Sequence, residues 1–160
     1  MQIEIMTTGG TIDKVYFDAK SSFEIGEPQI GEVLHDANLT ISYRITPLLR
    51  KDSLDIDETD RKMIKTAVIE SSAEKIVITH GTDTMIKTAT YLQGIAGKTI
   101  VLTGAMQPAR FRFTDAIYNI ASAITSVQLL PEGAWIAMNG QIFDPETAWK
   151  NVEMNRFENI

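Results

Sequence analysis

The chain has 160 residues, 44% of them hydrophobic and 22% charged, which is the size and composition of one globular domain. Its 15 basic and 21 acidic residues give a formal net charge of −6. This charge argues against a nucleic-acid partner, because nucleic acids are bound mainly through clustered Lys and Arg. There is no cysteine, which excludes a disulfide framework and thiolate metal sites.

The sequence also lacks the features of several other protein classes. It shows no basic, apolar N-terminal segment of the secretory type, and no apolar run reaches the roughly 18 residues that span a bilayer. We therefore expect a cytoplasmic protein with no membrane partner. Its two histidines, His35 and His80, are far apart, and no histidines and carboxylates cluster at ligand spacing, so we expect no metal site and no cofactor.

The predicted elements of the first half begin with an apolar strand over 3–11 (IEIMTTGGT), which ends in a turn rich in Gly and Thr. The segment 13–30 lacks sustained periodicity, so we expect a long loop there, of the kind that often forms a lid or binding loop. A strand over 38–49, up to Pro47, and a helix over 57–73 follow. The helix has two candidate N-caps, Asp57 and Thr59, and its predicted buried stripe is Met63, Ile64, Ala67 and Val68.

The second half alternates between strand and helix patterns. The strands are 75–84 (KIVITHGTDT), 99–106 (TIVLTGAM) and 134–141 (AWIAMNGQ), and the helices are 84–98 and 114–130, the latter opened by Thr114. Strands this continuous in apolar residues are typical of a parallel sheet covered on both faces. The sequence therefore predicts a doubly wound, mainly parallel α/β fold of Rossmann-like type, as one domain over 1–160.

Polar residues gather where three of these strands end. In open α/β sheets, ligands bind outside the carboxyl ends of the strands, and the turns TTGGT at 7–11, HGTDT at 80–84 and TGAMQP at 103–108 would lie on that edge. They supply threonine hydroxyls, a carboxylate and small residues that let a ligand approach the backbone. A threonine hydroxyl is a weak nucleophile until a base or cation activates it. By themselves, the turns indicate a small-molecule site at the sheet edge.

Each of these residues also has a purely structural interpretation. Thr82 and Asp83 are equally suited to cap a helix. The Gly9–Gly10 pair suits a tight turn, and a dinucleotide loop is not supported because the Gly-x-Gly-x-x-Gly spacing is absent. His80 is expected to be a semi-buried polar residue beside its turn. For Lys150, in a polar segment, an exposed surface position is the default expectation.

Taken together, TGGTI at 8–12, HGTDT at 80–84 and GAMQP at 104–108 occur in an order that resembles the N-terminal catalytic domain of the bacterial-type L-asparaginases. The resemblance extends from Thr8 to Lys150. It implies an amidohydrolase that converts the side-chain amide of L-asparagine, or of a related small amide, to a carboxylate and ammonia by threonine nucleophilic catalysis. It also implies a homo-oligomer, either a dimer or a tetramer.

The resemblance assigns roles to individual residues. Thr11 corresponds to the loop threonine that serves as the nucleophile. Thr82 and Asp83 match the second threonine and its neighbouring aspartate, and Asp83 is expected to hold the α-ammonium group of the substrate. Lys150, after the strand and turn at 138–150, would complete a hydrogen-bonded triad with these two side chains.

The remaining residues that the resemblance implies belong to substrate binding. The segment DSLDI at 52–56 places Ser53 where the family binds the substrate carboxylate. The backbone groups of Gly10, Gly81 and Ala105 are expected to line the pocket. The segment TDAIYN at 114–119 resembles the start of a helix in the family and is interpreted as a structural match.

The sequence departs from the family pattern in three places. FEIG at 23–26 puts Phe23 where the activating tyrosine of the mobile loop is expected, and Tyr16, seven residues earlier, is the nearby substitute. Leu54 replaces a glutamine that often follows the carboxylate-binding serine. The family commonly carries a second, C-terminal domain, whereas this sequence ends at Ile160, so we expect a short, single-domain form that resembles only the catalytic domain.

These departures leave two alternatives to an asparaginase. The first is a non-catalytic domain that binds aspartate or an asparagine-like molecule. The second is a hydrolase that acts on a different small amide or on a nucleoside through the same threonines.

Overall fold

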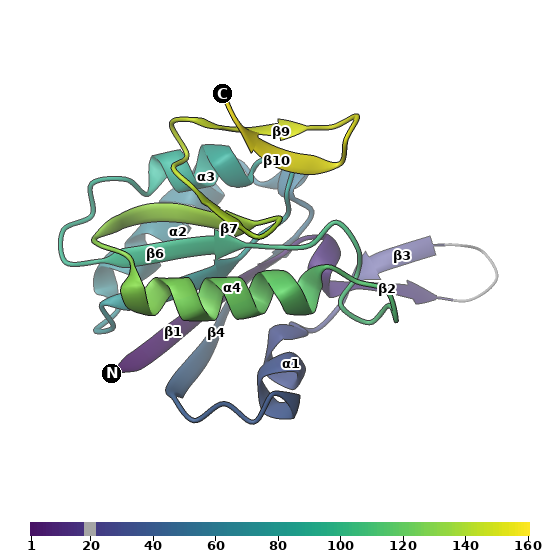
Figure 1. The fold of residues 1–160 in the computed structure, drawn as a ribbon, viewed down its shortest axis with the longest axis horizontal. Helices are drawn as coiled ribbons and strands as arrows, with labels where there is room; N and C mark the ends of the chain where they lie inside the picture. Colours follow the sequence, from purple (N-terminus) through teal and green to yellow (C-terminus); the bar gives the residue numbers. More distant parts are fainter. Residues whose placement is uncertain (18–21) are drawn as a thin grey trace.

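A six-stranded sheet forms the centre of the computed structural model, which describes residues 1–17 and 22–160 (Figure 1). Five strands are parallel and, counted in chain order, are arranged 2-1-3-4-5, with an antiparallel strand at one edge. Across the sheet they are β4 (Ser42–Lys51), β1 (Gln2–Gly9), β5 (Lys75–Thr79), β6 (Thr99–Thr103), β7 (Gly133–Met138) and β8 (Gln141–Phe143). The predicted doubly wound, mainly parallel α/β fold is confirmed.

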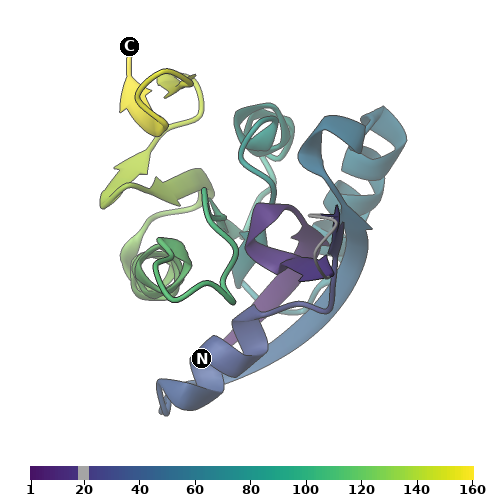
Figure 2. The same cartoon turned by 90° about the vertical axis from the view of Figure 1, so that its right-hand side faces the viewer.

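Helices cover both faces of the sheet (Figure 2). One face carries α2 (Glu58–Glu70) and α3 (Met85–Tyr91), and the other carries α1 (Ile30–Asp36) and α4 (Ala116–Leu129). Successive strand residues pack on opposite faces, so that Ile78 contacts the α2 and α3 side and Val77 the α1 and α4 side. Among the described residues, no helix is both long and apolar enough to cross a membrane.

The strand β4 extends further than the sequence predicts. It continues through Pro47 to Lys51, so the expected end at Pro47 is wrong. β4 lies at the edge of the sheet and, within residues 1–17 and 22–160, pairs only with β1, where Pro47 is the register partner of Thr7. Proline is tolerated on an edge strand because one row of backbone N–H groups there has no strand to bond to.

The helix α2 begins at a capping box. The Asp57 side chain accepts a hydrogen bond from the Asp60 N–H at 2.9 Å, and the Asp60 side chain accepts one from the Asp57 N–H at 3.0 Å. Of the predicted stripe, Ile64 and Val68 are fully buried and Ala67 is partly buried, but Met63 is 41% exposed, so its inclusion was wrong. Met63 lies about 100° around the helix axis from Ile64 and therefore turns away from the sheet.

The segment 13–30, which the sequence predicts to be a loop, contains regular structure instead. A short 3-10 turn, η1 (Thr11–Asp13), leads into a hairpin of β2 (Lys14–Phe17) and β3 (Ser22–Ile25), in which Tyr16 lies opposite Phe23. The hairpin projects from the edge of the sheet at which β1 ends (Figure 1). Its strands have only four residues each and neither face of the hairpin is buried in the core, so they give no sustained pattern by which the sequence could reveal them.

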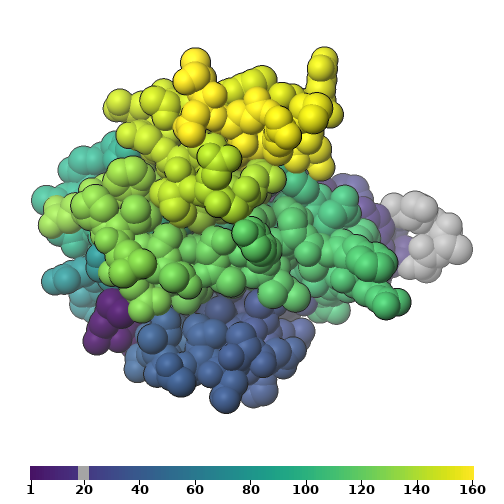
Figure 3. Space-filling model, viewed as in Figure 1, coloured from purple at the N-terminus to yellow at the C-terminus, as the bar shows by residue number. Residues whose placement is uncertain are grey.

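A second antiparallel pair, β9 (Ala148–Asn151) and β10 (Arg156–Asn159), follows the main sheet and was not predicted. Figure 3 shows this C-terminal segment in yellow at one end of the molecule. Ala148 and Phe157 are buried against the α3 side of the core, and the Phe157 and Phe143 rings lie 6.2 Å apart. Core packing therefore fixes the position of β9.

The capping box allows a direct choice between the two predicted N-caps of α2. We expect Asp57→Ala to lower the free energy of unfolding by about 1 kcal/mol, because it leaves the Asp60 N–H without its acceptor. Thr59→Ala, at an exposed position in the first turn of the same helix, is the matched control and should change it by less than about 0.5 kcal/mol. Urea unfolding of both variants measures this, and equal losses would show that Asp57 is not the cap.

Candidate active site

Three backbone segments meet closely at the carboxyl ends of β1, β4 and β5. Gly10 has φ of +89°, and a Cβ atom placed on it would lie 2.5 Å from both the N and the Cα of Gly81. A Cβ atom on Gly81 would in turn lie 2.6 Å from the Cβ of Ser53. Because β1 and β5 flank the point where the strand order reverses, these turns occupy the position at which α/β sheets bind ligands.

Hydrogen bonds hold the three segments in this arrangement. The Gly10 N–H donates to the Lys51 carbonyl at 2.9 Å, and the Thr84 hydroxyl donates to the Ser53 carbonyl at 2.7 Å. Ser53 begins the short 3-10 turn η2 (Ser53–Asp55) and is 1% exposed, with its side chain against Gly81. Ser53 therefore lies beneath the Gly81 turn. The sequence did not predict the contact of Thr84 with Ser53.

The Gly104–Pro108 turn is anchored by the start of α4. The Asp115 carboxylate accepts hydrogen bonds from the N–H groups of Met106 and Gln107, and the Asn119 side chain donates to the Gly104 carbonyl at 2.9 Å. The 114–119 segment thus shapes the turn that presents Ala105, which is 1% exposed. This is a structural role, as the resemblance implies for that segment.

Lys150 reaches the site from β9. Its Nζ lies 2.8 Å from the Thr82 Oγ1 and 2.6 Å from the Asp83 Oδ1, so one ammonium group donates to both side chains. The Lys150 side chain is only 16% exposed, which overturns the default expectation of a surface position, while that of Asp83 is 45% exposed. The site is therefore open to solvent on the side of the carboxylate.

The structure also decides between capping and another use of Thr82 and Asp83. The N-cap of α3 is Thr84, and no side-chain capping hydrogen bond is formed there. The hydrogen bonds found for the Thr82 hydroxyl and the Asp83 carboxylate are those with Lys150. The interpretation of this pair as a helix cap is therefore wrong.

Thr11 and Tyr16 are placed differently with respect to this triad. Thr11 is partly exposed at the start of η1 and directly follows Gly10, so its turn is in contact with the Gly81–Thr82 turn. Tyr16 lies out on the hairpin, 48% exposed, with its ring against Phe23 and Phe111. The structure thus brings the Thr11 turn to the triad, whereas the Tyr16 ring packs on two other aromatic rings.

His80 is fully buried beneath its turn. Its Nδ1 donates to the Gly81 carbonyl at 2.7 Å, and its Nε2 accepts from the Thr88 hydroxyl at 2.9 Å. The pKa of His80 is lowered to about 4, mainly by burial and to a smaller extent by the nearby Arg61 charge, against the effect of the Gly81 bond. A neutral imidazole with both nitrogens occupied serves to orient the Gly81–Thr82 peptide.

Asp13 is a second buried titratable group near the site. It is 2% exposed, and its Oδ1 accepts from the Gln29 N–H at 2.9 Å. Burial raises the pKa of Asp13 to about 6, although the Gln29 bond and the Arg50 charge act in the opposite direction.

The two shifted groups affect stability in opposite directions as the pH falls. For His80, the unfolded chain takes up a proton near pH 6.5 and the folded chain only near pH 4, so stability is lost between these values. For Asp13, the folded chain takes up a proton near pH 6 and the unfolded chain near 3.8, so stability is gained. Each effect is on the order of 3 kcal/mol, because one pKa unit corresponds to about 1.4 kcal/mol.

Replacing Asp13 should separate the two effects. We expect Asp13→Asn to be about 1–3 kcal/mol more stable than the wild type at pH 7, because the wild type then buries a charged carboxylate that the variant does not have. This advantage should disappear as the pH falls to about 4, because Asp13 is then protonated in the wild type. Urea unfolding between pH 4 and pH 7.5 measures the difference, and a difference that does not vary with pH would contradict the raised pKa of Asp13.

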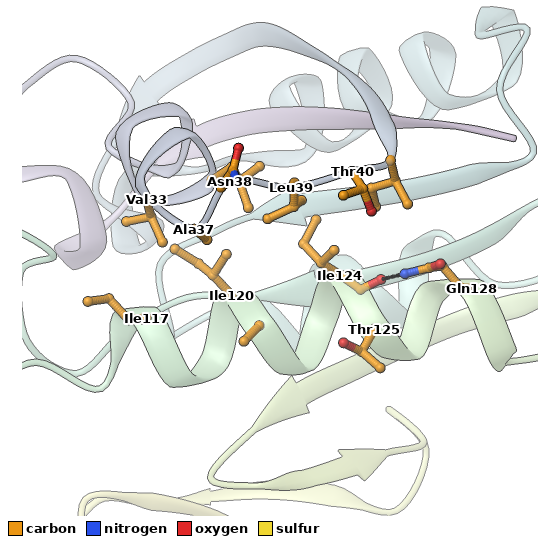
Figure 4. A pocket seen from close by; sticks show the side chains of 13 residues that line it. Val33, Ala37, Asn38, Leu39, Thr40, Ile117, Ile120, Ile124, Thr125 and Gln128 are labelled. Carbon is orange, nitrogen blue, oxygen red and sulfur yellow. Dashed lines mark hydrogen bonds between the residues drawn. The ribbon is translucent and has the colours of Figure 1, made fainter.

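An apolar groove of about 380 Å³ lies elsewhere, between α1 and α4 (Figure 4). In the figure, Val33 and Leu39 face Ile120 and Ile124 across the groove. None of the residues that line it carries a titratable side chain. The groove therefore offers no acid, base or charged partner for hydrolysis, in contrast to the open site around Lys150.

Comparisons with known proteins find relatives that match nearly the whole chain. The family model "Asparaginase, N-terminal" matches residues 2–158. The chain is 30% identical to an L-asparaginase from Thermococcus kodakarensis, in a match that covers 100% of this chain and 51% of that protein. It is 41% identical over 78 residues to a glutamyl-tRNA(Gln) amidotransferase component from Methanococcus vannielii, which covers 48% of this chain and 18% of that protein.

The fold agrees with these matches. The solved structure of the thermostable L-asparaginase from Thermococcus kodakarensis superposes with a TM-score of 0.84 and 26% identity, covering 100% of this chain and 51% of that chain. The chain therefore spans about half the length of the asparaginases that it matches. The site geometry, the match over residues 2–158 and the common fold lead to one conclusion: this chain belongs to the asparaginase family and corresponds to its N-terminal domain.

Proposed function

We propose that this protein is an amidohydrolase that converts the side-chain amide of L-asparagine, or of a closely related small amide, to a carboxylate and ammonia. The observation that carries the proposal is the ammonium group of Lys150, shared between Thr82 and Asp83 beside the Thr11 turn. A threonine hydroxyl needs a neighbouring base or cation to activate it, and a largely buried ammonium group next to two hydroxyl-bearing turns can supply that activation. Membership of the asparaginase family supports the reaction type.

In the proposed mechanism, the Thr11 oxygen attacks the amide carbon and the Thr11 proton passes to the leaving nitrogen. The C–N bond then breaks, ammonia leaves, and water hydrolyses the resulting ester to free the carboxylate and restore Thr11. Backbone N–H groups near Thr82 or Ala105 would stabilise the oxyanion. Lys150 orients the Thr82 hydroxyl by hydrogen bonding and would bias it toward proton transfer, and Tyr16 is the phenol available to assist proton transfer at Thr11.

Recognition of the amino acid would rest on groups of opposite charge. The Asp83 carboxylate is close to half exposed and would bind the α-ammonium group of the substrate. The Ser53 turn, together with backbone groups of Gly10 and Gly81, would bind the α-carboxylate. Leu54 is 72% exposed, so no side-chain amide stands there to add a polar contact with the substrate.

Removing the nucleophile or the cation tests the proposal. We expect Thr11→Ala to abolish ammonia release from L-asparagine, and Lys150→Met to lower kcat by about 10²- to 10⁴-fold, as for loss of a proton-transfer group. Lys87→Met is the matched control, because Lys87 is a surface lysine on α3 that pairs only loosely with Glu58 at 3.5 Å. Ammonia is quantified by a coupled assay with asparagine, glutamine, other small amides and nucleosides.

The same experiment separates the proposal from its alternatives. Tight binding of aspartate or asparagine by calorimetry, without ammonia release from any amide, would establish a binding domain instead. Preference for a nucleoside or for an amide that is not an amino acid would displace asparagine as the substrate. Release that survives in Thr11→Ala would assign the nucleophile to another residue.

We also propose that the protein acts in the cytoplasm as a homo-oligomer. Exposed apolar side chains of α4 support association with a second copy, since Ile117 is 57%, Tyr118 64% and Leu129 81% exposed. We expect light scattering to give a mass at least twice the 17.8 kDa of one chain. A single 17.8 kDa species at assay concentrations would contradict the oligomer.

A further inference from the structure

The hairpin β2–β3 beside the site cannot hold its own position. Each strand has four residues, and an isolated two-stranded hairpin is at best marginally stable in water. Its aromatic side chains are not buried in the core, since Tyr16, Phe17 and Phe23 are each about half exposed. Specific contacts with the rest of the molecule must therefore determine where the hairpin lies.

The first such contact is an aromatic stack. The Tyr16 ring lies 5.4 Å from the Phe111 ring with an angle of 30° between their planes, and 5.8 Å from its cross-strand partner Phe23 at 56°. Phe111 is 40% exposed and belongs to the loop that follows the Gly104–Pro108 turn. A stacked pair of rings at this separation is favourable beyond the area that it buries.

The loop that carries Phe111 is itself tied to the proposed nucleophile turn. The Ala109 N–H donates to the Ile12 carbonyl at 3.0 Å, one residue after Thr11. The Phe111 N–H donates to the Pro108 carbonyl at 3.0 Å, which closes the loop locally. The position of Phe111 relative to Thr11 is therefore set by backbone hydrogen bonds that do not involve the hairpin strands.

A second contact ties the base of the hairpin to the Ser53 turn. The Lys14 Nζ lies 3.7 Å from the Asp52 carboxylate and 4.1 Å from the centre of the Phe23 ring. Lys14 is at the start of β2 and reaches Tyr16 only through Phe23, whereas Phe111 stacks directly on the Tyr16 ring from outside the hairpin.

We propose that Phe111 is a positioning residue: its ring holds the Tyr16 ring and its loop is bonded to the Thr11 turn, so that it sets where the Tyr16 phenol lies relative to Thr11. The inference rests on the proposed function for the role of the phenol, but the stacking itself does not depend on it. Because the Phe111 ring stacks on the Tyr16 ring, its effect on the reaction passes through Tyr16.

The test is a double-mutant cycle with Tyr16→Phe, which keeps the ring but removes the hydroxyl. Phe111→Leu should lower kcat/KM by about 2- to 10-fold, the fold-change that corresponds to loss of an aromatic pair. Phe111→Tyr, which keeps the ring, should retain wild-type activity. In the Tyr16→Phe background, Phe111→Leu should have no further effect, because the group through which it acts is already absent.

The matched control is Phe113→Leu, in the same loop, whose ring is 81% exposed and lies near Arg112. It should change neither kcat/KM nor the position of the hairpin. A readout without substrate is the NMR shift of the Tyr16 ring protons, which should move toward the value of an exposed tyrosine in Phe111→Leu and stay unchanged in Phe113→Leu. Unfolding midpoints establish that all variants are folded.

The outcomes distinguish failure of this inference from failure of the proposed function. Unchanged Tyr16 shifts in Phe111→Leu would overturn the inference whatever the activity. Equal losses from Phe111→Leu with and without the Tyr16 hydroxyl would also overturn it. If the wild type releases no ammonia, the proposed function fails, and the ring shifts alone decide whether Phe111 positions Tyr16.

Discussion

The site depends on the close approach of two glycine backbones. Gly10 and Gly81 lie so near each other that a single Cβ atom on Gly10 would overlap the Gly81 backbone, and Gly81 has the same relation to Ser53. Any larger residue would push apart the turns that follow β1, β4 and β5. With Gly10 held at positive φ, the chain can leave β1 and place Thr11 in the turn adjacent to Thr82.

The charge of the site is brought in by a part of the molecule that is distant in sequence. Lys150 lies 68 residues after Thr82 and reaches it because the β9–β10 pair is fixed by Ala148 and Phe157 in the core. An ammonium group that donates to a hydroxyl and a carboxylate at once is well satisfied while it remains largely shielded from water. Apolar packing on the α3 face thus determines the geometry of a polar network at the sheet edge.

The histidine beside the candidate site is already engaged in hydrogen bonds and is not free to act as a base. His80 follows β5 directly, yet it is buried, with both ring nitrogens in hydrogen bonds and a pKa lowered to about 4. Its imidazole supports the Gly81 carbonyl from beneath. Tyr16, in contrast, lies on the β2–β3 hairpin with its ring stacked on Phe111, so the phenol closest in sequence to Thr11 is held by aromatic packing.

The sequence by itself determined the doubly wound fold and the identity of the site turns. Both are local properties. Buried parallel strands have continuous apolar sequences, and each of the turns TGGTI, HGTDT and GAMQP is an unbroken stretch of the chain. Only the tertiary structure decided that α3 is capped at Thr84 and that the segment after Thr11 forms a hairpin, while the contact of Lys150 with Thr82 and Asp83 was expected only from the family resemblance. These features depend on contacts between residues far apart in sequence, such as Lys150 with Thr82 and Tyr16 with Phe111, and no local pattern encodes them.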